Sequence, residues 1–257
     1  MRAALAPAGV RLATAAMGTR FELVLHGEDP IALKTAGEAA IERIEEAHGL
    51  FTRFEPSSLI AHLRRLAPAW VAVDRDTVEL FLDVVAVARA SAGAFDPTGR
   101  GDWPAIHIDA AGQRLRLARP TVELDLGAIA KGHAIDLAIA ALREAGVESA
   151  FVHGGTSSGF GLGRPPGIDA WRVGWTGGPE AFELLDQAYA VSATLRDRGG
   201  AIEAHVVDPR TGQSLTSSRQ VIVIGPTARL ADAWATAALV TGERPASLGE
   251  EWTVVTR

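Results

Sequence analysis

The chain has 257 residues, of which 47% are hydrophobic and 22% are charged, a composition typical of a soluble globular protein and not of a disordered one. Its net charge of −6 gives no basic surface for nucleic acid or for an anionic membrane, so neither partner is expected. The chain contains no cysteine, which excludes disulfides, zinc–thiolate and iron–sulfur sites, a cysteine nucleophile and a lipid-anchored cysteine.

In residues 1–12, Arg2 precedes a weakly apolar run, which is the order of charge and apolar residues found in a targeting segment. Pro7, Gly9 and Arg11 interrupt the apolar run, which leaves it too short for the core of a signal peptide. No stretch approaches the roughly 20 apolar residues that a membrane helix requires. We therefore expect a cytoplasmic protein that does not insert into a membrane.

The first part of the chain is predicted to contain long helices and short strands. Residues 31–51 repeat apolar side chains at helical spacing. Ser57 or Ser58 is a suitable N-cap for a short helix that ends at Leu66. The other elements expected here are strands at residues 20–26 and 70–73 and a helix at residues 77–92, ending near Gly93.

The second part of the chain is predicted to be richer in strands, and residues 154–163 form a glycine-rich stretch. Strands and helices do not alternate regularly here, and the later strands follow one another. This order favours an α+β fold with mostly antiparallel sheets over a doubly wound parallel sheet. The expected elements are strands at residues 114–117, 121–126, 150–153, 171–175, 203–207, 220–224 and 252–255, and helices at residues 127–146 and 228–241.

Asp232 and Thr236 are four residues apart in a predicted helix, so their side chains project from one face. A carboxylate and a hydroxyl that converge on one point suit a hard cation such as magnesium, which shares its oxygen ligands with phosphate. The alternative is structural: a charge near the start of the helix and a threonine that packs against a neighbour.

Residues 123–132 predict a strand that leads through Gly127 into a helix. Free backbone amides at a helix start favour an anion, and Lys131 adds a positive charge at the same place. The segment is not a Walker A loop, because it lacks the Gly-Lys-Ser/Thr ending. A solvated surface lysine is the alternative interpretation.

His205 lies on a predicted strand that leads into a turn beginning at Asp208. A histidine accepts a proton near neutral pH, which a hydroxyl nucleophile needs. The alternatives are a histidine packed at a sheet edge and an aspartate that only forms the turn. Two weaker segments, residues 17–19 and 93–98, are compatible with simple turns.

Together these segments resemble the ApbE family of flavin transferases, over nearly the whole chain. Two segments match most specifically. One is residues 125–132, which begin with Asp-Leu-Gly and end with Lys-Gly, and the other is residues 231–236, which begin with Ala-Asp-Ala and end with Thr. The matching segments are residues 17–19, 54–59, 93–98, 125–132 with Asp136, 205–212 and 231–236.

The resemblance implies one flavin transferase domain over residues 1–257, built from two intertwined α/β subdomains with mostly antiparallel sheets and with the FAD site between them. It implies Mg²⁺, with Mn²⁺ as an alternative, held by Asp232, Thr236 and the backbone carbonyl near Ala128. His205 would help to deprotonate the acceptor, and Lys131 would assist. The residues expected to contact FAD are Met17, Ser58, Asp96, Gly127, Lys131 and Asp208.

The chain departs from the family pattern in three places. The usual Thr-Ser-Gly appears as residues 191–193, Val-Ser-Ala, and the glycine-rich Asn-x-Gly-Gly-Asp ends in Thr156. An asparagine often found beyond Ser58 is replaced near Arg64. These changes concern flavin and phosphate contacts, and they leave the metal pair and His205 unchanged.

The resemblance implies magnesium-dependent transfer of FMN from FAD to a threonine or serine hydroxyl of an acceptor flavoprotein, with release of AMP. If water replaces the acceptor, the same site becomes a FAD pyrophosphatase. A non-catalytic FAD-binding protein is the alternative that the three departures favour.

Overall fold

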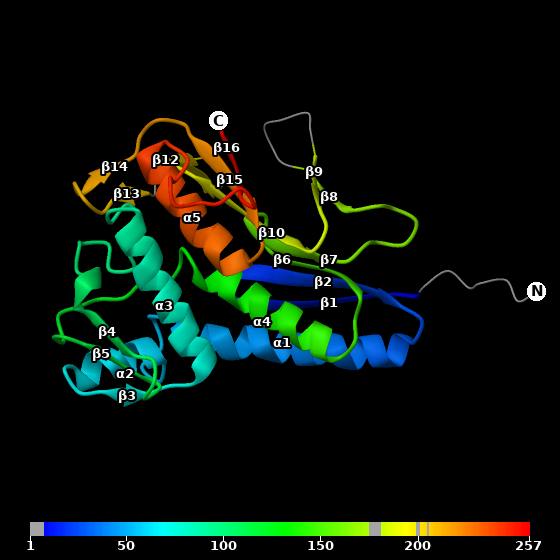
Figure 1. The fold of residues 1–257 in the computed structure, drawn as a ribbon, viewed down its shortest axis with the longest axis horizontal. Helices are drawn as coiled ribbons and strands as arrows, with labels where there is room; N and C mark the ends of the chain where they lie inside the picture. The colour runs from blue at the N-terminus through cyan, green and yellow to red at the C-terminus, as the bar shows by residue number, and fades with distance from the viewer. Residues whose placement is uncertain (1–7, 175–180, 199–200, 205) are drawn as a thin grey trace, which may run out of the picture.

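The computed structural model describes residues 8–174, 181–198, 201–204 and 206–257. Its largest element is a seven-stranded sheet of order β1-β2-β6-β7-β10-β15-β16 (Figure 1). Every neighbouring pair of strands in this sheet is antiparallel. The strands are β1 (Ala8–Ala16), β2 (Thr19–Gly27), β6 (Ser149–Gly154), β7 (Ser158–Leu162), β10 (Gln187–Ala193), β15 (Gln220–Gly225) and β16 (Thr253–Thr256).

Three helices cover one face of the sheet and bury the larger hydrophobic core against it (Figure 1). α1 (Pro30–Phe51) lies against β1 and β2, α4 (Ala130–Glu144) against β6 and β7, and α5 (Ala228–Thr241) against β10 and β15. α4 also packs on both of the other helices. In the described part of the chain, no helix is both long enough and apolar enough to cross a bilayer.

The opposite face of the sheet carries a smaller apolar cluster under the hairpin of β8 (Trp171–Val173) and β9 (Phe182–Leu184). Successive residues of a strand point to opposite faces. Ala188 and Ala190 of β10 therefore enter the helix-side core, whereas Tyr189 enters the smaller cluster. The main sheet is thus packed on both faces near its centre.

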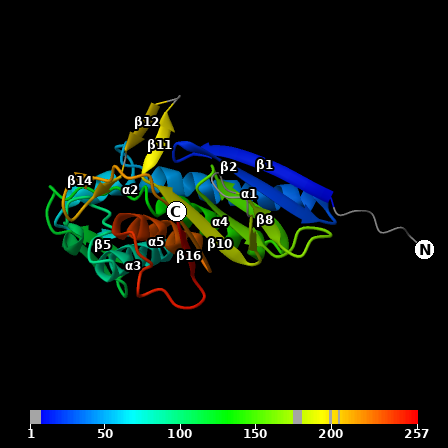
Figure 2. The ribbon, with the colours of Figure 1, turned by 90° about the horizontal axis from the view of Figure 1, so that it is seen from above.

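The segment between α1 and α4 forms a second layered unit beside the main sheet (Figure 1). Its sheet has the order β3-β5-β4. Figure 2 shows the hairpin of β11 (Leu195–Arg198) and β12 (Ala201–Ala204) projecting beyond the rest of the molecule. The remaining elements are α2 (Leu59–Leu66), β3 (Val71–Ala72), α3 (Arg75–Ala90), η1 (Trp103–Ala105), β4 (Ile106–Asp109), β5 (Arg114–Leu117), β13 (Val207–Asp208) and β14 (Gln213–Ser214).

The predicted α+β class with mostly antiparallel sheets is confirmed, and all five α-helices lie where helices were expected. The last of them, α5 (Ala228–Thr241), has the predicted bounds, and α2 is capped by Ser58, whose Oγ accepts the Ala61 N–H at 3.1 Å. Local patterns were sufficient for these elements because each buries one continuous stripe of apolar side chains.

The strand predicted at residues 121–126 is wrong. Val122, Leu124 and Leu126 are buried, which produces the alternating pattern of a strand. The segment does not belong to any sheet, and its Asp125 N–H instead donates to the Pro97 carbonyl at 2.7 Å. An extended segment that lies on a core shows the same period of two as a strand in a ladder.

Two other boundaries also differ from the prediction. Residues 127–129 form a turn, so the helix predicted from residue 127 begins at Ala130. The strand predicted at residues 203–207 is divided between the ends of β12 and β13.

The strands that the sequence did not predict are β1, β4, β7, β9, β10, β11 and β14. β7 is the clearest case, because it lies within the glycine-rich stretch and every one of its residues is buried. A Cβ added at Gly159 would lie 2.5 Å from the Tyr189 ring, and one added at Gly161 would lie 2.8 Å from the Trp171 ring. These glycines therefore make room for aromatic rings that come from other strands.

Candidate active site

A cleft of about 2090 Å³ runs along the face where the main sheet, the starts of α4 and α5 and the second unit meet. It is larger than the roughly 300–1,000 Å³ of an ordinary small-molecule pocket, so a dinucleotide fits its size. The lining side chains that carry polar atoms include Asp96, Asp125, Lys131, Thr156, Ser157, Ser192, Asp232 and Thr236.

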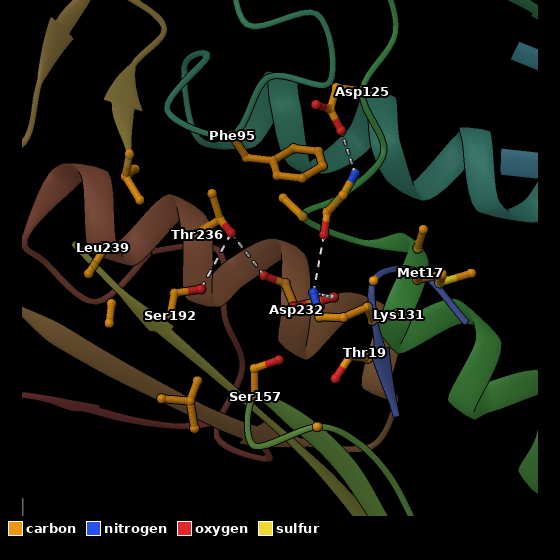
Figure 3. Close-up of a pocket in the computed structure, with 18 of the residues that line it drawn as sticks. Met17, Thr19, Phe95, Asp125, Lys131, Ser157, Ser192, Asp232, Thr236 and Leu239 are labelled. Carbon is orange, nitrogen blue, oxygen red and sulfur yellow. Dashed lines mark hydrogen bonds and ion pairs between the residues drawn. The ribbon is translucent and has the colours of Figure 1, made fainter. Parts of the chain in front are cut away.

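Asp232 is the most deeply buried acid of the cleft, with 3% of its surface exposed. Its Oδ2 lies 3.4 Å from the Lys131 ammonium (Figure 3). The same oxygen accepts the Gly132 N–H at 3.3 Å. Ser158 donates to Oδ1 at 3.5 Å. A charge taken this far from water needs such partners, and Lys131 and the two weaker donors supply them.

Thr236 follows Asp232 by one helical turn and faces the same cleft (Figure 3). Its Oγ1 donates to the Asp232 carbonyl at 3.3 Å and lies 3.5 Å from the Ser192 hydroxyl of β10. On the other side, Lys131 Nζ donates to the Gly127 carbonyl at 3.2 Å, and Ala128 lines the cleft beside it. The structure thus brings the predicted metal residues and Lys131 into one cleft.

The turn before α4 positions Lys131. Asp125 Oδ1 accepts the Gly127 N–H at 2.9 Å, and the Ile129 and Ala130 N–H groups bond back to the Leu126 carbonyl. The helix therefore begins close to the cleft, with Lys131 in its first turn, where a positive charge favours a bound anion.

Gly132 allows α4 and α5 to approach closely. A Cβ at this position would lie 2.1 Å from the Ala228 carbonyl oxygen, which is backbone of α5 and has no room to shift without moving the helix. Because only glycine permits this contact, the Gly132 N–H comes close enough to bond the Asp232 carboxylate.

Asp136 caps α5 from another helix. The N-cap residue Thr227 makes no side-chain cap, and the Asp136 carboxylate instead accepts the Ala228 N–H at 2.7 Å and the Arg229 N–H at 3.0 Å. Arg229 also pairs with Asp83 of α3 at 2.6 Å. Although Asp136 keeps some exposed surface, desolvation by the surrounding protein raises its pKa to about 6. The first turn of α5, which precedes Asp232, is therefore held by Asp136 of α4 and by Asp83 of α3.

We expect Asp136→Ala to destabilise the protein by about 1–2 kcal/mol, the usual cost of a lost cap. Urea unfolding of the wild type and the variant measures this loss.

Asp29→Ala is the matched control, because Asp29 caps α1 through the Ile31 and Ala32 N–H groups. It should lower stability by a similar amount, because it removes a cap of the same kind. An Asp136→Ala protein that is as stable as the wild type would contradict the capping role of Asp136.

A metal ion here would have one protein carboxylate. Among the described residues, no three His, Cys, Asp or Glu side chains converge on one point. Asp232, the Thr236 hydroxyl and a carbonyl of the turn before α4 offer oxygen atoms only, which suits Mg²⁺ or Mn²⁺. The residues fit such an ion provided that water and substrate phosphate supply the remaining ligands.

The other predicted binding residues are placed differently. Met17 and Asp96 line the cleft, but the Asp96 carboxylate already accepts the Thr98 and Arg100 N–H groups, which shapes its own turn. Ser58 and Asp208 are buried and are not among the described residues that line the cleft. His205 lies outside the described residues.

Asp208 instead anchors its turn. Arg210 donates to its carboxylate from Nε at 2.9 Å and from Nη2 at 2.8 Å, which holds the pKa of Asp208 below its usual range. This bidentate pair positions the turn that follows residue 207.

The sequence model of the ApbE family matches residues 17–101 and 99–251, which together span most of the chain. The chain belongs to the ApbE family. Proteins described as FAD:protein FMN transferase resemble it, and the solved structures of two family members share its fold.

The relatives differ in how much of their length is matched. The Rhodobacter capsulatus protein is 36% identical over 151 residues, covering 55% of this chain and 27% of that protein. The Chlamydia trachomatis serovar D protein is 33% identical over 142 residues, covering 52% of this chain and 44% of that protein. The Treponema pallidum protein is 27% identical over 278 residues, covering 88% and 77%. The chain thus spans less than half of the first two relatives.

The structural likeness extends over nearly the whole chain. The flavin transferase ApbE from Vibrio cholerae superposes with a TM-score of 0.83 and 21% identity, covering 97% of this chain and 93% of that one. The ApbE protein from Thermotoga maritima gives a TM-score of 0.78 and 24% identity, covering 91% and 87%. At these identities the likeness demonstrates the shared fold.

All three departures of this ApbE-family chain reach the cleft, because Arg64, Thr156 and Val191 line it. Two polar residues that the sequence did not single out also belong to the site: Ser158, which is fully buried against Asp232, and Ser192, which faces Thr236. β7 and β10 bring these hydroxyl groups to α5, so their contacts with Asp232 and Thr236 could not be predicted from the local sequence, although residues 191–193 match a family segment.

Proposed function

We propose that this chain transfers FMN from FAD to a threonine or serine hydroxyl of an acceptor flavoprotein and releases AMP, in a reaction that requires magnesium. The observation that carries the proposal is the pairing of Asp232 and Lys131, with Thr236 one turn away, inside a cleft large enough for a dinucleotide. The relatives described as FAD:protein FMN transferase support the same reaction.

In this reaction the acceptor hydroxyl oxygen forms a bond to the FMN phosphorus, and the bond from that phosphorus to the AMP oxygen breaks. Negative charge spreads over the phosphoryl oxygens as the bonds exchange, so catalysis depends on positioning and on nearby positive charge. Lys131 supplies that charge, and the start of α4 orients the diphosphate. We propose His205 as the base that takes the hydroxyl proton.

Asp232, Thr236 and the carbonyl near Ala128 would hold magnesium, which would neutralise phosphate charge when bound. Met17 and Asp96 line the same cleft and would contact FAD. For Ser58, Gly127 and Asp208 a contact with FAD stays a prediction. Manganese would replace magnesium, because both prefer oxygen ligands.

Incubation of the purified protein with FAD, with and without magnesium, tests the proposal. AMP and FMN are separated by chromatography, and an added acceptor protein is weighed by mass spectrometry. Magnesium-dependent AMP release together with a mass gain of one FMN on the acceptor is the expected result. AMP and free FMN without labelling would identify a pyrophosphatase, and FAD retained intact under all conditions would identify a binding protein.

A further inference from the structure

The Lys131 ammonium contacts oxygen atoms that would otherwise be free to coordinate a cation. Its Nζ is 3.4 Å from Asp232 Oδ2 and 3.2 Å from the Gly127 carbonyl oxygen (Figure 3). The side chain of Asp232 is 4% exposed and that of Lys131 is 20% exposed, so water screens the pair weakly. One ammonium therefore already satisfies the buried carboxylate and an oxygen of the neighbouring turn.

The charge around Asp232 is balanced by this contact. Among the described residues, the carboxylate has Lys131 as its charged partner, and its other donors, Ser158 and the Gly132 N–H, are neutral. A divalent cation that approached the pair would meet a net charge of zero and would have to displace an ammonium. With one carboxylate as its strongest ligand, such a site has little affinity for a free ion.

We propose that Lys131 is the resident counter-ion of the metal site and competes with the metal for Asp232. The diphosphate of FAD, the substrate in the proposed function on which this inference rests, draws the ammonium away from the carboxylate. It also brings negative charge and further oxygen ligands. Metal and dinucleotide therefore bind with positive cooperativity, and the protein without FAD keeps Asp232 paired internally.

If Lys131 only helped to form the site, its removal would leave the metal affinity unchanged or lower it, whereas competition for Asp232 predicts that the metal affinity rises. Removal of the ammonium leaves a buried carboxylate without its counter-ion, which destabilises the protein. The same removal frees that carboxylate for a metal. By reciprocity, a metal bound only to the native state restores the lost stability.

The experiment uses the FAD-free protein and manganese as the probe. The chain contains two lysines, Lys131 and Lys34, and Lys34 pairs with Glu38 at 3.6 Å on the exposed surface of α1. Lys131→Met and Lys34→Met therefore remove the same charge from a buried pair and from an exposed one. Free manganese is measured by electron paramagnetic resonance, and Tm is measured in EDTA and in manganese.

We expect Lys131→Met to bind manganese roughly 10- to 100-fold more tightly than the wild type without FAD, within the usual range of coupling between sites. Its Tm should be lower than that of the wild type in EDTA and should recover in manganese. Lys34→Met should match the wild type in both measurements. The additional change Asp232→Asn should abolish the gain in manganese affinity, which locates the ion at Asp232.

Manganese affinity that is unchanged or lower in Lys131→Met would overturn the inference. If that variant does not fold, Lys131→Gln, which keeps a donor near Asp232, is measured in the same way and decides the question. The readout is separate from turnover. A gain in metal affinity without flavin transfer by the wild type would leave the inference standing and refute the proposed function.

Discussion

Asp232→Asn is expected to lower the rate of the proposed flavin transfer by roughly 10³-fold and to remove the proposed magnesium dependence of what remains, because a metal-stabilised phosphoryl charge is worth several kcal/mol. Asparagine has nearly the shape of aspartate, and its single side-chain oxygen can still accept the Gly132 N–H, while its NH2 group can donate to the Ser158 hydroxyl that now donates to the second carboxylate oxygen. The charge that would hold the ion and that pairs with Lys131 is lost. Rates of AMP release over a magnesium titration measure the effect.

The matched control is Asp169→Asn, the same chemical change at an exposed aspartate outside the cleft. It should leave the rate and the magnesium dependence unchanged. Circular dichroism of both variants establishes that they are folded. An Asp232→Asn protein with full magnesium-dependent turnover would show that the metal lies elsewhere.

His133 is expected to make the protein sensitive to acid. It lies on α4 with 2% of its surface exposed, its ring meets Phe51 edge-on at 5.5 Å, and its Nδ1 is buried without a hydrogen-bond partner in the described part of the structure. Burial lowers the pKa of His133 to about 3, and the nearby Arg229 charge acts in the same direction. The native state therefore holds this ring neutral.

In the unfolded chain the same imidazole titrates near pH 6.5. Below that pH the unfolded state binds a proton that the native state does not bind, so the free energy of unfolding falls as the pH falls toward 3. One unit of pKa difference corresponds to about 1.4 kcal/mol, which gives a loss of roughly 3 kcal/mol between pH 7 and pH 4.

Urea unfolding of the wild type and His133→Leu at pH 7 and pH 4 tests this expectation. His133→Leu should lose roughly 3 kcal/mol less stability over this range. Asp136, whose raised pKa makes the opposite contribution, is present in both proteins, so its effect largely cancels in the difference. His107→Leu, at a half-buried histidine of β4, should follow the wild type. Parallel losses in the wild type and His133→Leu would contradict the assignment.

Much of the helical framework was predictable from local patterns. The helix of residues 228–241 was predicted with its observed bounds, and the spacing of Asp232 and Thr236 placed both side chains on one face of it. These features depend on residues close in the chain, where helical periodicity alone decides which side chains share a face. The order of the motifs along the chain similarly indicated the ApbE family, which the match over most of the chain confirms.

The strands were less predictable, because their residues meet partners that are remote in the chain. The glycines of β7 suggest a loop until the Tyr189 and Trp171 rings that occupy their missing side-chain volume are known. The alternation at residues 121–126 suggests a strand, although its apolar side chains pack on a core without a paired neighbour. Sheet pairing is a property of two segments, and neither segment determines it alone.

The sequence by itself determined the helices, the α+β class, the family and the residue types able to hold a cation and a phosphate. Only the tertiary structure decided that Lys131 and Asp232, 101 residues apart, form one buried pair, that Ser158 and Ser192 belong to the same site, and that Asp136 caps α5. The physical reason is that a buried charge depends on which donors the packing of α4, α5 and the sheet brings within a few ångströms. Helix crossing and strand order set those distances, and no local pattern in the chain records them.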